Sequence, residues 1–189
     1  GDELLYIIAL SRKAQGQLHG TVVGTLMSNL GMEIALRDEG IDFYRSKVGD
    51  RYVMELLQDT HSLIGGEGSG HIICLDCLST GDGIVAALQV LAAMHESGKS
   101  LHELKSGMSK FPQSLVNVTM SRRIDPGSDD KINNAIKQVE QELGETGRVL
   151  LRLSGTEPLV RVTLEGADSS QVEELARQLA DTVREELGA

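Results

Sequence analysis

The spacing of apolar and polar positions changes repeatedly along the chain, and each spacing predicts a helix or a strand. Leu4, Leu5, Ile8 and Ala9 recur on one face of a helix expected over residues 2–15. Further helices are expected at 29–39, 50–57 and 83–97, and strands at 21–26, 41–48, 62–64 and 72–75. Strands that alternate with helices in this way indicate a layered α/β domain with largely parallel pairing.

The pattern changes after Phe111-Pro112. Three strands are expected at 115–120, 148–153 and 159–165, with one helix that ends at Gly144 and another that begins near residue 169. Ser170 and Glu173 have the spacing of a capping box for the second helix. The fold class expected is therefore α/β: a three-layer α/β domain over residues 1–112, followed by a small α+β domain over 113–189.

Composition narrows the classes of partner. The 189 residues suffice for two small domains, and 18 Lys and Arg against 28 Asp and Glu give a net charge of −10. Such a charge repels nucleic acid and anionic lipid, and no apolar run approaches the roughly 18–20 residues that span a bilayer. Two cysteines fit a reducing compartment. We expect a cytoplasmic protein that binds neither nucleic acid nor membrane.

The strongest chemical signal is a loop between the last two expected strands. It is rich in Ser, Gly and Thr and carries an arginine at each shoulder, which supplies the several convergent donors that a phosphate dianion needs. The candidate phosphate-binding residues are Arg152, Ser154, Gly155, Thr156 and Arg161. Alternatively, the loop is a plain hairpin turn whose arginines pair with Glu157 or Glu165. No Gly-Lys-Ser/Thr follows, so this is not a nucleotide-hydrolysing P-loop.

A second loop, GGEGSGH at residues 65–71, contains four glycines that allow close approach to the backbone. Glu67, Ser69 and His71 offer a carboxylate, a hydroxyl and an imidazole, a set that suits the hydroxyls of a sugar ring. The alternative is a flexible loop with a solvated glutamate and a structural histidine. A dinucleotide-binding loop fits poorly, because this segment leads into a strand and not into a helix.

Cys74 and Cys77 form a C-x-x-C motif. A structural zinc site needs four ligands, and a redox pair normally opens a helix, whereas this motif follows a strand. The sequence therefore favours two incidental, partly buried thiols. The nearby TGDG segment at 80–83 places Asp82 as a helix N-cap.

Several of these motifs occur in one order along the chain, and together they resemble a known family. They are GTLMSN at 24–29, VGDRYV at 48–53, GEGSGH at 66–71, TGDG at 80–83 and RLSGTEP at 152–158. The set resembles the C-terminal half of the α-D-phosphohexomutases, above all the bacterial members that act on glucosamine phosphates. The resemblance covers essentially the whole chain.

The resemblance implies four domains around a cleft, of which this chain matches the third and fourth. The family's phosphoserine, in a Ser-His-Asn-Pro context, and its Asp-x-Asp-x-Asp magnesium loop belong to the first two, and neither motif occurs in this sequence. Mg²⁺ and the nucleophile would therefore come from N-terminal domains of the same protein. The chain would hold no metal ligand and no catalytic residue, apart from His71 as a candidate aid to proton transfer, and it would be inactive alone. Its start, without Met and directly in a helical pattern, also favours a piece of a longer protein.

The implied reaction interconverts glucosamine 6-phosphate and glucosamine 1-phosphate, through a phosphoserine and a glucosamine 1,6-bisphosphate intermediate. The resemblance assigns Glu67, Ser69 and His71 to the sugar and the 152–161 loop to the phosphate. Two positions depart from the family pattern: Gly68 replaces a longer side chain, and Leu153 a frequent lysine. Two alternatives remain open, namely a phosphomannomutase/phosphoglucomutase relative and a stand-alone sugar-phosphate-binding module.

Overall fold

The computed structural model describes residues 1–121, 124–155 and 157–188, and the chain forms two compact units, residues 1–110 and 111–189. In the first unit a four-stranded sheet has the strand order β2-β1-β3-β4. Its elements are α1 (Asp2–Ala14), β1 (Val22–Thr25), α2 (Leu30–Asp38), β2 (Phe43–Ser46), α3 (Asp50–Asp59), β3 (Ile64–Gly66), β4 (Ile72–Cys74), α4 (Gly83–Ser97) and α5 (Leu101–Leu104).

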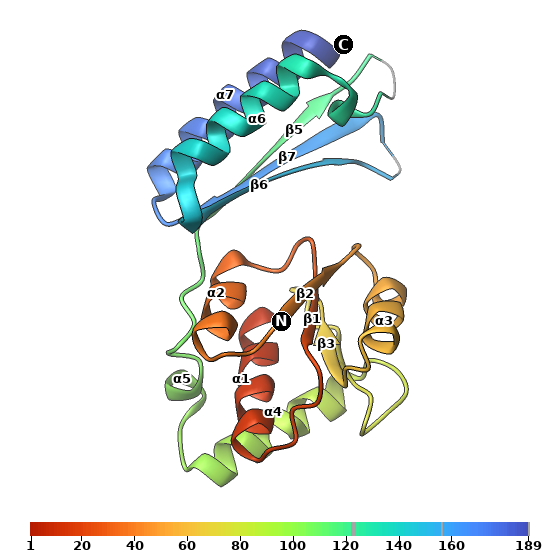
Figure 1. Ribbon diagram of the computed structural model, residues 1–189, viewed down its shortest axis with the longest axis vertical. Helices are drawn as coiled ribbons and strands as arrows, with labels where there is room; N and C mark the ends of the chain where they lie inside the picture. Colours follow the sequence, from red (N-terminus) through yellow and green to blue (C-terminus); the bar gives the residue numbers. More distant parts are fainter. Residues whose placement is uncertain (122–123, 156, 189) are drawn as a thin grey trace. The chain divides into compact units, whose positions relative to one another are not determined.

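Helices cover both faces of this sheet (Figure 1). On one face α1, α2 and α4 share a core with one set of strand side chains, Val22, Ile64, Ile72 and Cys74 among them. On the other face α3 packs through Val53 and Leu57 against a smaller cluster. The expected three-layer arrangement is confirmed.

The strand pairing is only partly parallel. β1 pairs in parallel with β2 and with β3, as expected, but β4 runs antiparallel to β3. A parallel crossover takes a dozen or more residues, and only residues 67–71 separate these two strands, so the chain must turn straight back. This tight return shapes the 67–71 loop.

The second unit is a three-stranded antiparallel sheet of order β5-β7-β6, with two helices on one face (Figure 1). Its elements are β5 (Gln113–Thr119), α6 (Asp130–Leu143), β6 (Gly147–Leu153), β7 (Leu159–Gly166) and α7 (Ser169–Leu187), with short 3₁₀ turns at Pro126–Ser128 and Gly144–Thr146. Val160, Val162 and Leu164 of β7 point into the core beneath the helices. The alternate β7 residues, Arg161 among them, therefore face the opposite side of the sheet.

Two helix starts test the capping expectations. Asp82 caps α4 as expected, and its side chain accepts hydrogen bonds from the backbone amides of Ile84 and Val85, both at 2.8 Å. The capping box expected at Ser170 is wrong, because Asp168 is the N-cap of α7 and accepts from the amide of Gln171 at 2.9 Å. The helix begins two residues earlier than a cap at Ser170 requires, and a carboxylate is an equally good cap.

Candidate functional site

The sugar loop, residues 67–71, lies at the edge of the first sheet where β1, β2 and β3 all end. Because these three strands are parallel, the loops that follow them meet at this edge. The Glu67 carboxylate accepts a hydrogen bond from the amide of Gly49, in the loop after β2, at 2.9 Å. Backbone bonds from Glu67 to His71 and from Gly70 to Glu67, each 2.9 Å, close the sugar loop. Glu67 is half-buried, and Ser69 is exposed at the tip of the loop.

His71 sits at the base of the sugar loop with its ring against Gly81. A Cβ at position 81 would meet the imidazole Nε2, so any larger residue there would displace the ring from this position. The ring Nε2 is 3.9 Å from the Asp50 carboxylate, beyond hydrogen-bonding distance, and within the described residues this buried atom has no hydrogen-bond partner. Glu67, Ser69 and His71 thus share one loop, and the His71 Nε2 is covered by the neighbouring chain without a hydrogen-bond partner among the described residues.

Arg45 fixes the conformation of the loop that follows β1, between Thr25 and Ser28. Its guanidinium binds the Glu33 carboxylate through two N–H groups, at 2.9 and 2.7 Å. It also donates to the carbonyls of Thr25 and Ser28, at 3.0 and 2.7 Å. This loop belongs to the GTLMSN motif, and the contacts explain how the motif keeps a defined shape beside the sugar loop.

The sequence analysis missed Asp2, a buried carboxylate that links the same two loops. One Asp2 oxygen accepts from the amide of Asn29 at 2.9 Å, while the other, Oδ1, is buried and has no hydrogen-bond partner among the residues described. A Cβ at Gly68 would lie 3.4 Å from the carboxylate oxygens, so Gly68 packs directly on this group. An acidic residue in the first turn of a helix indicates dipole stabilisation, and the sequence carries no signal for the contact with a loop 66 residues away.

Two cations at the same edge also escaped the sequence analysis. Lys47 and Arg51 lie over the ring of Tyr52, with their charged groups 5.6 and 5.8 Å from its centroid. Both flank Gly49, whose amide binds Glu67. Positive charge therefore accompanies the sugar loop, although the chain as a whole is acidic.

In the second unit, the strands around the phosphate loop place two arginines side by side. Arg152 of β6 and Arg161 of β7 are direct cross-strand partners on the sheet face away from the helices. The Nε atom of each is buried and has no hydrogen-bond partner in the described part of the chain. Like charges at directly opposed positions destabilise a sheet. An anion bound between them would relieve the repulsion and satisfy both buried donors.

Of the two carboxylates that the hairpin interpretation proposed as partners, Glu157 and Glu165, the second is paired elsewhere. Glu165 is fully buried and binds the guanidinium of Arg148, with Nη2 and Nε at 2.7 and 3.1 Å from one carboxylate oxygen. Over the described ranges neither Arg152 nor Arg161 forms an ion pair. The arrangement therefore favours an external anion over an internal carboxylate.

The loop itself is shaped by Ser154. Ser154 is buried, its amide donates to the carbonyl of Leu159 at 2.9 Å, and its hydroxyl accepts from the amide of Glu157 at 3.3 Å. Gly155 is exposed, with open space where a Cβ would stand. Thr156, also expected to bind phosphate, lies outside the described residues.

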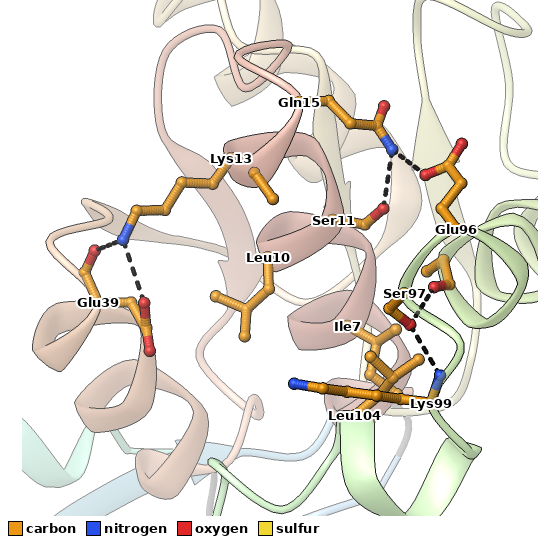
Figure 2. A pocket seen from close by; sticks show the side chains of 12 residues that line it. Ile7, Leu10, Ser11, Lys13, Gln15, Glu39, Glu96, Ser97, Lys99 and Leu104 are labelled. Atoms are coloured by element: carbon orange, nitrogen blue, oxygen red, sulfur yellow. Dashed lines mark hydrogen bonds and ion pairs between the residues drawn. The ribbon is translucent and has the colours of Figure 1, made fainter.

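A cavity of about 480 Å³ opens elsewhere in the first unit, between the C-terminal ends of α1 and α4 (Figure 2). Its floor is apolar, with Ile7, Leu10 and Leu104, and the Lys99 side chain extends across it. The sugar loop lies beside the N-terminus of α1, whereas the cavity is lined by α1 only from Ile7 onward, roughly 9 Å farther along the helix axis. We do not assign the sugar to this cavity, because polar side chains on its rim bind one another.

Comparison with known protein families follows this division of the chain. Residues 1–111 match the model for phosphoglucomutase/phosphomannomutase, alpha/beta/alpha domain III, and residues 115–182 match the model for the C-terminal domain of the same family. The chain belongs to the phosphoglucomutase/phosphomannomutase family. The resemblance inferred from the motifs is confirmed.

Curated relatives of this family define the similarity more closely. The chain is 60% identical over 183 residues to the phosphoglucosamine mutase of Methylococcus capsulatus, a match that covers 97% of this chain and 41% of the relative. It is 58% identical over 188 residues to that of Nitrosococcus oceani, covering 42% of that protein. The chain thus spans about two fifths of the length of these relatives and matches their C-terminal part.

Solved structures of the family share the fold. An Aspergillus fumigatus N-acetylphosphoglucosamine mutase superposes with a TM-score of 0.83 at 21% identity, over 100% of this chain and 44% of that one. A second structure of that fungal enzyme, in complex with glucose 1,6-bisphosphate, gives a TM-score of 0.80 at 21% identity. At this identity the likeness establishes the fold alone.

The described residues do not fit the magnesium site that the family resemblance implies for a whole enzyme. Across residues 1–121, 124–155 and 157–188, no three His, Cys, Asp or Glu side chains lie close enough together to hold a metal ion. None of the helices in the described segments combines the length and apolar character needed to cross a bilayer.

Proposed function

We propose that this chain is the substrate-holding part of a phosphoglucosamine mutase, which interconverts glucosamine 6-phosphate and glucosamine 1-phosphate. The first unit holds the sugar ring through Glu67, Ser69 and His71, and its proposed domain extends over residues 1–112. The second unit holds the phosphate through Arg152, Arg161 and the 154–156 loop, and its proposed domain extends over residues 113–189. The observation that carries the proposal is the Arg152–Arg161 pair, with two buried Nε donors that lack a partner in the described structure.

The two guanidinium groups select a phosphate that bears two negative charges. Hydrogen bonds between charged partners contribute about 1.5–3 kcal/mol each, roughly twice a neutral bond, so two arginine contacts provide most of the affinity for the anion. Hydroxyls and backbone amides of the 154–156 loop add directional donors. A neutral sugar offers this loop nothing comparable, and the phosphate therefore anchors the substrate.

The sugar loop then recognises the sugar ring through hydrogen bonds. Glu67 accepts from ring hydroxyls or from the amino group of glucosamine, Ser69 donates or accepts at the exposed tip, and His71 contributes its partly exposed imidazole ring. The anchoring phosphate is C6-linked in one substrate and C1-linked in the other, so the same loop must accept the ring in two orientations. Short side chains and flexible glycine backbone at 68 and 70 suit that requirement.

The remaining parts of the reaction lie in the rest of such an enzyme. The phosphoserine and Mg²⁺ would be supplied by N-terminal domains. A glucosamine 1,6-bisphosphate intermediate would reorient between the two half-reactions. Here this chain holds the ring and the second phosphate while the first reacts. His71 is the candidate in this chain for aiding proton transfer. Cytoplasmic location and the absence of nucleic-acid or membrane partners stay predictions of the sequence.

A chimera tests this function. The chain replaces the matching part of the Methylococcus capsulatus relative, and turnover is measured with glucosamine, glucose and mannose phosphates. We expect no turnover by the chain alone, preferential turnover of glucosamine phosphates by the chimera, and a large loss on Arg152→Ala. Preference for glucose or mannose phosphates would instead support a phosphomannomutase/phosphoglucomutase. A folded but inactive chimera, with a chain that still binds sugar phosphate, would support a stand-alone binding module.

A further inference from the structure

The two cysteines of the C-x-x-C motif lie on the same side of the first sheet. Cys74 ends β4, is 2% exposed, and packs in the core cluster that contains α1. The chain then turns, with the Cys77 amide donating to the Cys74 carbonyl at 2.9 Å, and Cys77 is exposed. A turn of this kind keeps the first and fourth Cα atoms within about 7 Å. Disulfides bridge Cα atoms about 4.4–6.8 Å apart, so the backbone already has nearly the required span.

Arg12 of α1 brings a buried cation to this turn. Its side chain is 7% exposed, forms an ion pair with the Asp76 carboxylate, and donates to Gln89 Oε1 of α4 at 2.8 Å. Its third contact is with the Cys77 sulfur, at 3.6 Å from Nη2. The guanidinium therefore holds Cys77 Sγ toward α1, the same side on which Cys74 is buried. The sequence could not show this contact, because 65 residues separate Arg12 from Cys77.

The two thiols differ in their surroundings. Burial raises the pKa of the Cys74 thiol to about 11, an effect that Arg12 opposes and that Asp76 and Cys77 reinforce. Cys74 is therefore protonated at neutral pH and closed to solvent, and a bulky disulfide reagent cannot approach it. Cys77 is accessible and lies against a cationic donor. A reagent from solution meets Cys77 first.

We infer that Cys74 and Cys77 form a redox site that closes reversibly to a disulfide when a small-molecule disulfide such as oxidised glutathione is present. In the first step the Cys77 thiolate attacks the glutathione disulfide, a mixed disulfide forms, and one glutathione leaves as its thiolate. In the second, Cys74 loses its proton to solvent and attacks the Cys77 sulfur, which releases the second glutathione. Both cysteines are oxidised, and one glutathione disulfide is reduced to two thiols.

The inference replaces the sequence interpretation of incidental thiols, and it does not depend on the proposed sugar-phosphate function. A metal site at the motif is not supported, because the described residues provide no third His, Cys, Asp or Glu ligand near the two sulfurs. Because the resolving thiol is the buried one, its ionisation limits closure. The second step should accelerate about tenfold for each pH unit between pH 7 and 10.

The chain contains only these two cysteines, so a thiol count reports the site directly. The reduced chain is treated with excess oxidised glutathione, unfolded in denaturant with an alkylating reagent so that both thiols are accessible, and weighed intact. We expect loss of two hydrogens with no alkyl group and no bound glutathione, and dithiothreitol should restore two alkylatable thiols. Two alkylated thiols, persistent bound glutathione or disulfide-linked dimers from the wild-type chain would each overturn the inference.

Matched variants separate the roles of the two sulfurs. Cys74→Ala should stop at one glutathione attached through Cys77, because the resolving thiol is gone. Cys77→Ser should remain unmodified over the same time, because Cys74 is buried. Modification of Cys77→Ser at the wild-type rate, or closure of the wild-type chain at a rate independent of pH, would overturn the assigned order of attack.

Discussion

Replacing Arg161 with Gln should stabilise the second unit and at the same time abolish phosphate binding. Arg161 directly opposes Arg152 across β6 and β7, and both Nε atoms are buried without a partner among the described residues. Opposed cross-strand pairs contribute about 0.2–1 kcal/mol, here with an unfavourable sign. The variant should therefore gain up to about 1 kcal/mol at low salt, and the gain should shrink as salt screens the repulsion.

Arg148→Gln is the matched control, because it makes the same chemical change on the same face of the sheet, on the neighbouring strand β6. Arg148 pairs with Glu165, whose side chain is fully buried, so this change leaves a buried carboxylate without its ion-pair partner. Loss of one partner from a buried pair costs about 3–5 kcal/mol. The two variants should thus shift stability in opposite directions.

Urea unfolding combined with hydrogen exchange of β7 amides measures both variants, with and without inorganic phosphate. Phosphate at ten times its dissociation constant should stabilise the wild-type chain by about 1.4 kcal/mol and leave Arg161→Gln unchanged. The account of the arginine pair is refuted if Arg161→Gln loses stability as Arg148→Gln does. It is equally refuted if Arg161→Gln is stabilised by phosphate as strongly as the wild type.

Three further predictions concern the first unit. Glu67→Gln should weaken glucosamine 6-phosphate binding about tenfold by calorimetry without changing inorganic phosphate binding, since about 1.4 kcal/mol of a charged hydrogen bond is lost at the ring alone. Gly68→Asn should raise the free energy of unfolding by about 1 kcal/mol, because the new side-chain amide can donate to the Asp2 oxygen that has no partner among the described residues and that a Cβ at position 68 would contact. As the control, the same substitution in an Asp2→Asn background should give no gain in stability. The Lys105 hydrogen bond lowers the pKa of Glu3, so the stability that the pair adds is present above pH 4.5 and lost as pH falls through the folded value. Chemical denaturation at pH 7 and pH 3 should show Lys105→Met less stable at pH 7 and equal to wild type at pH 3, and a constant difference would contradict the pairing.

Local signals explain why the order of helices and strands followed from the sequence. The Asp82 cap and the αL glycine at position 98 mark the two ends of α4 as expected, because both signals depend on residues within one turn of the helix end. The small helix α5 was missed, although Ser100 and Glu103 form a capping box that the sequence displays. The antiparallel direction of β4 was also missed, although the shortness of the preceding loop already implied it.

Contacts between distant segments account for what the sequence left open. Glu67, Ser69 and His71 were found because they share one loop, whereas Asp2 reaches that loop from another helix. The sequence offered Glu165 as a partner for the loop arginines, and only the strand register shows that Arg148 takes it. Register and burial decide which charges meet, and neither is visible in local spacing.

Calorimetric titration of the chain with glucosamine 6-phosphate, glucosamine and inorganic phosphate tests the central claim most directly. The account predicts measurable binding of the sugar phosphate at millimolar concentration, weaker binding of inorganic phosphate and none of the neutral sugar. It also predicts loss of both phosphate-dependent signals in Arg152→Ala. Absence of sugar-phosphate binding at millimolar concentration, or equal binding by wild type and Arg152→Ala, would contradict it.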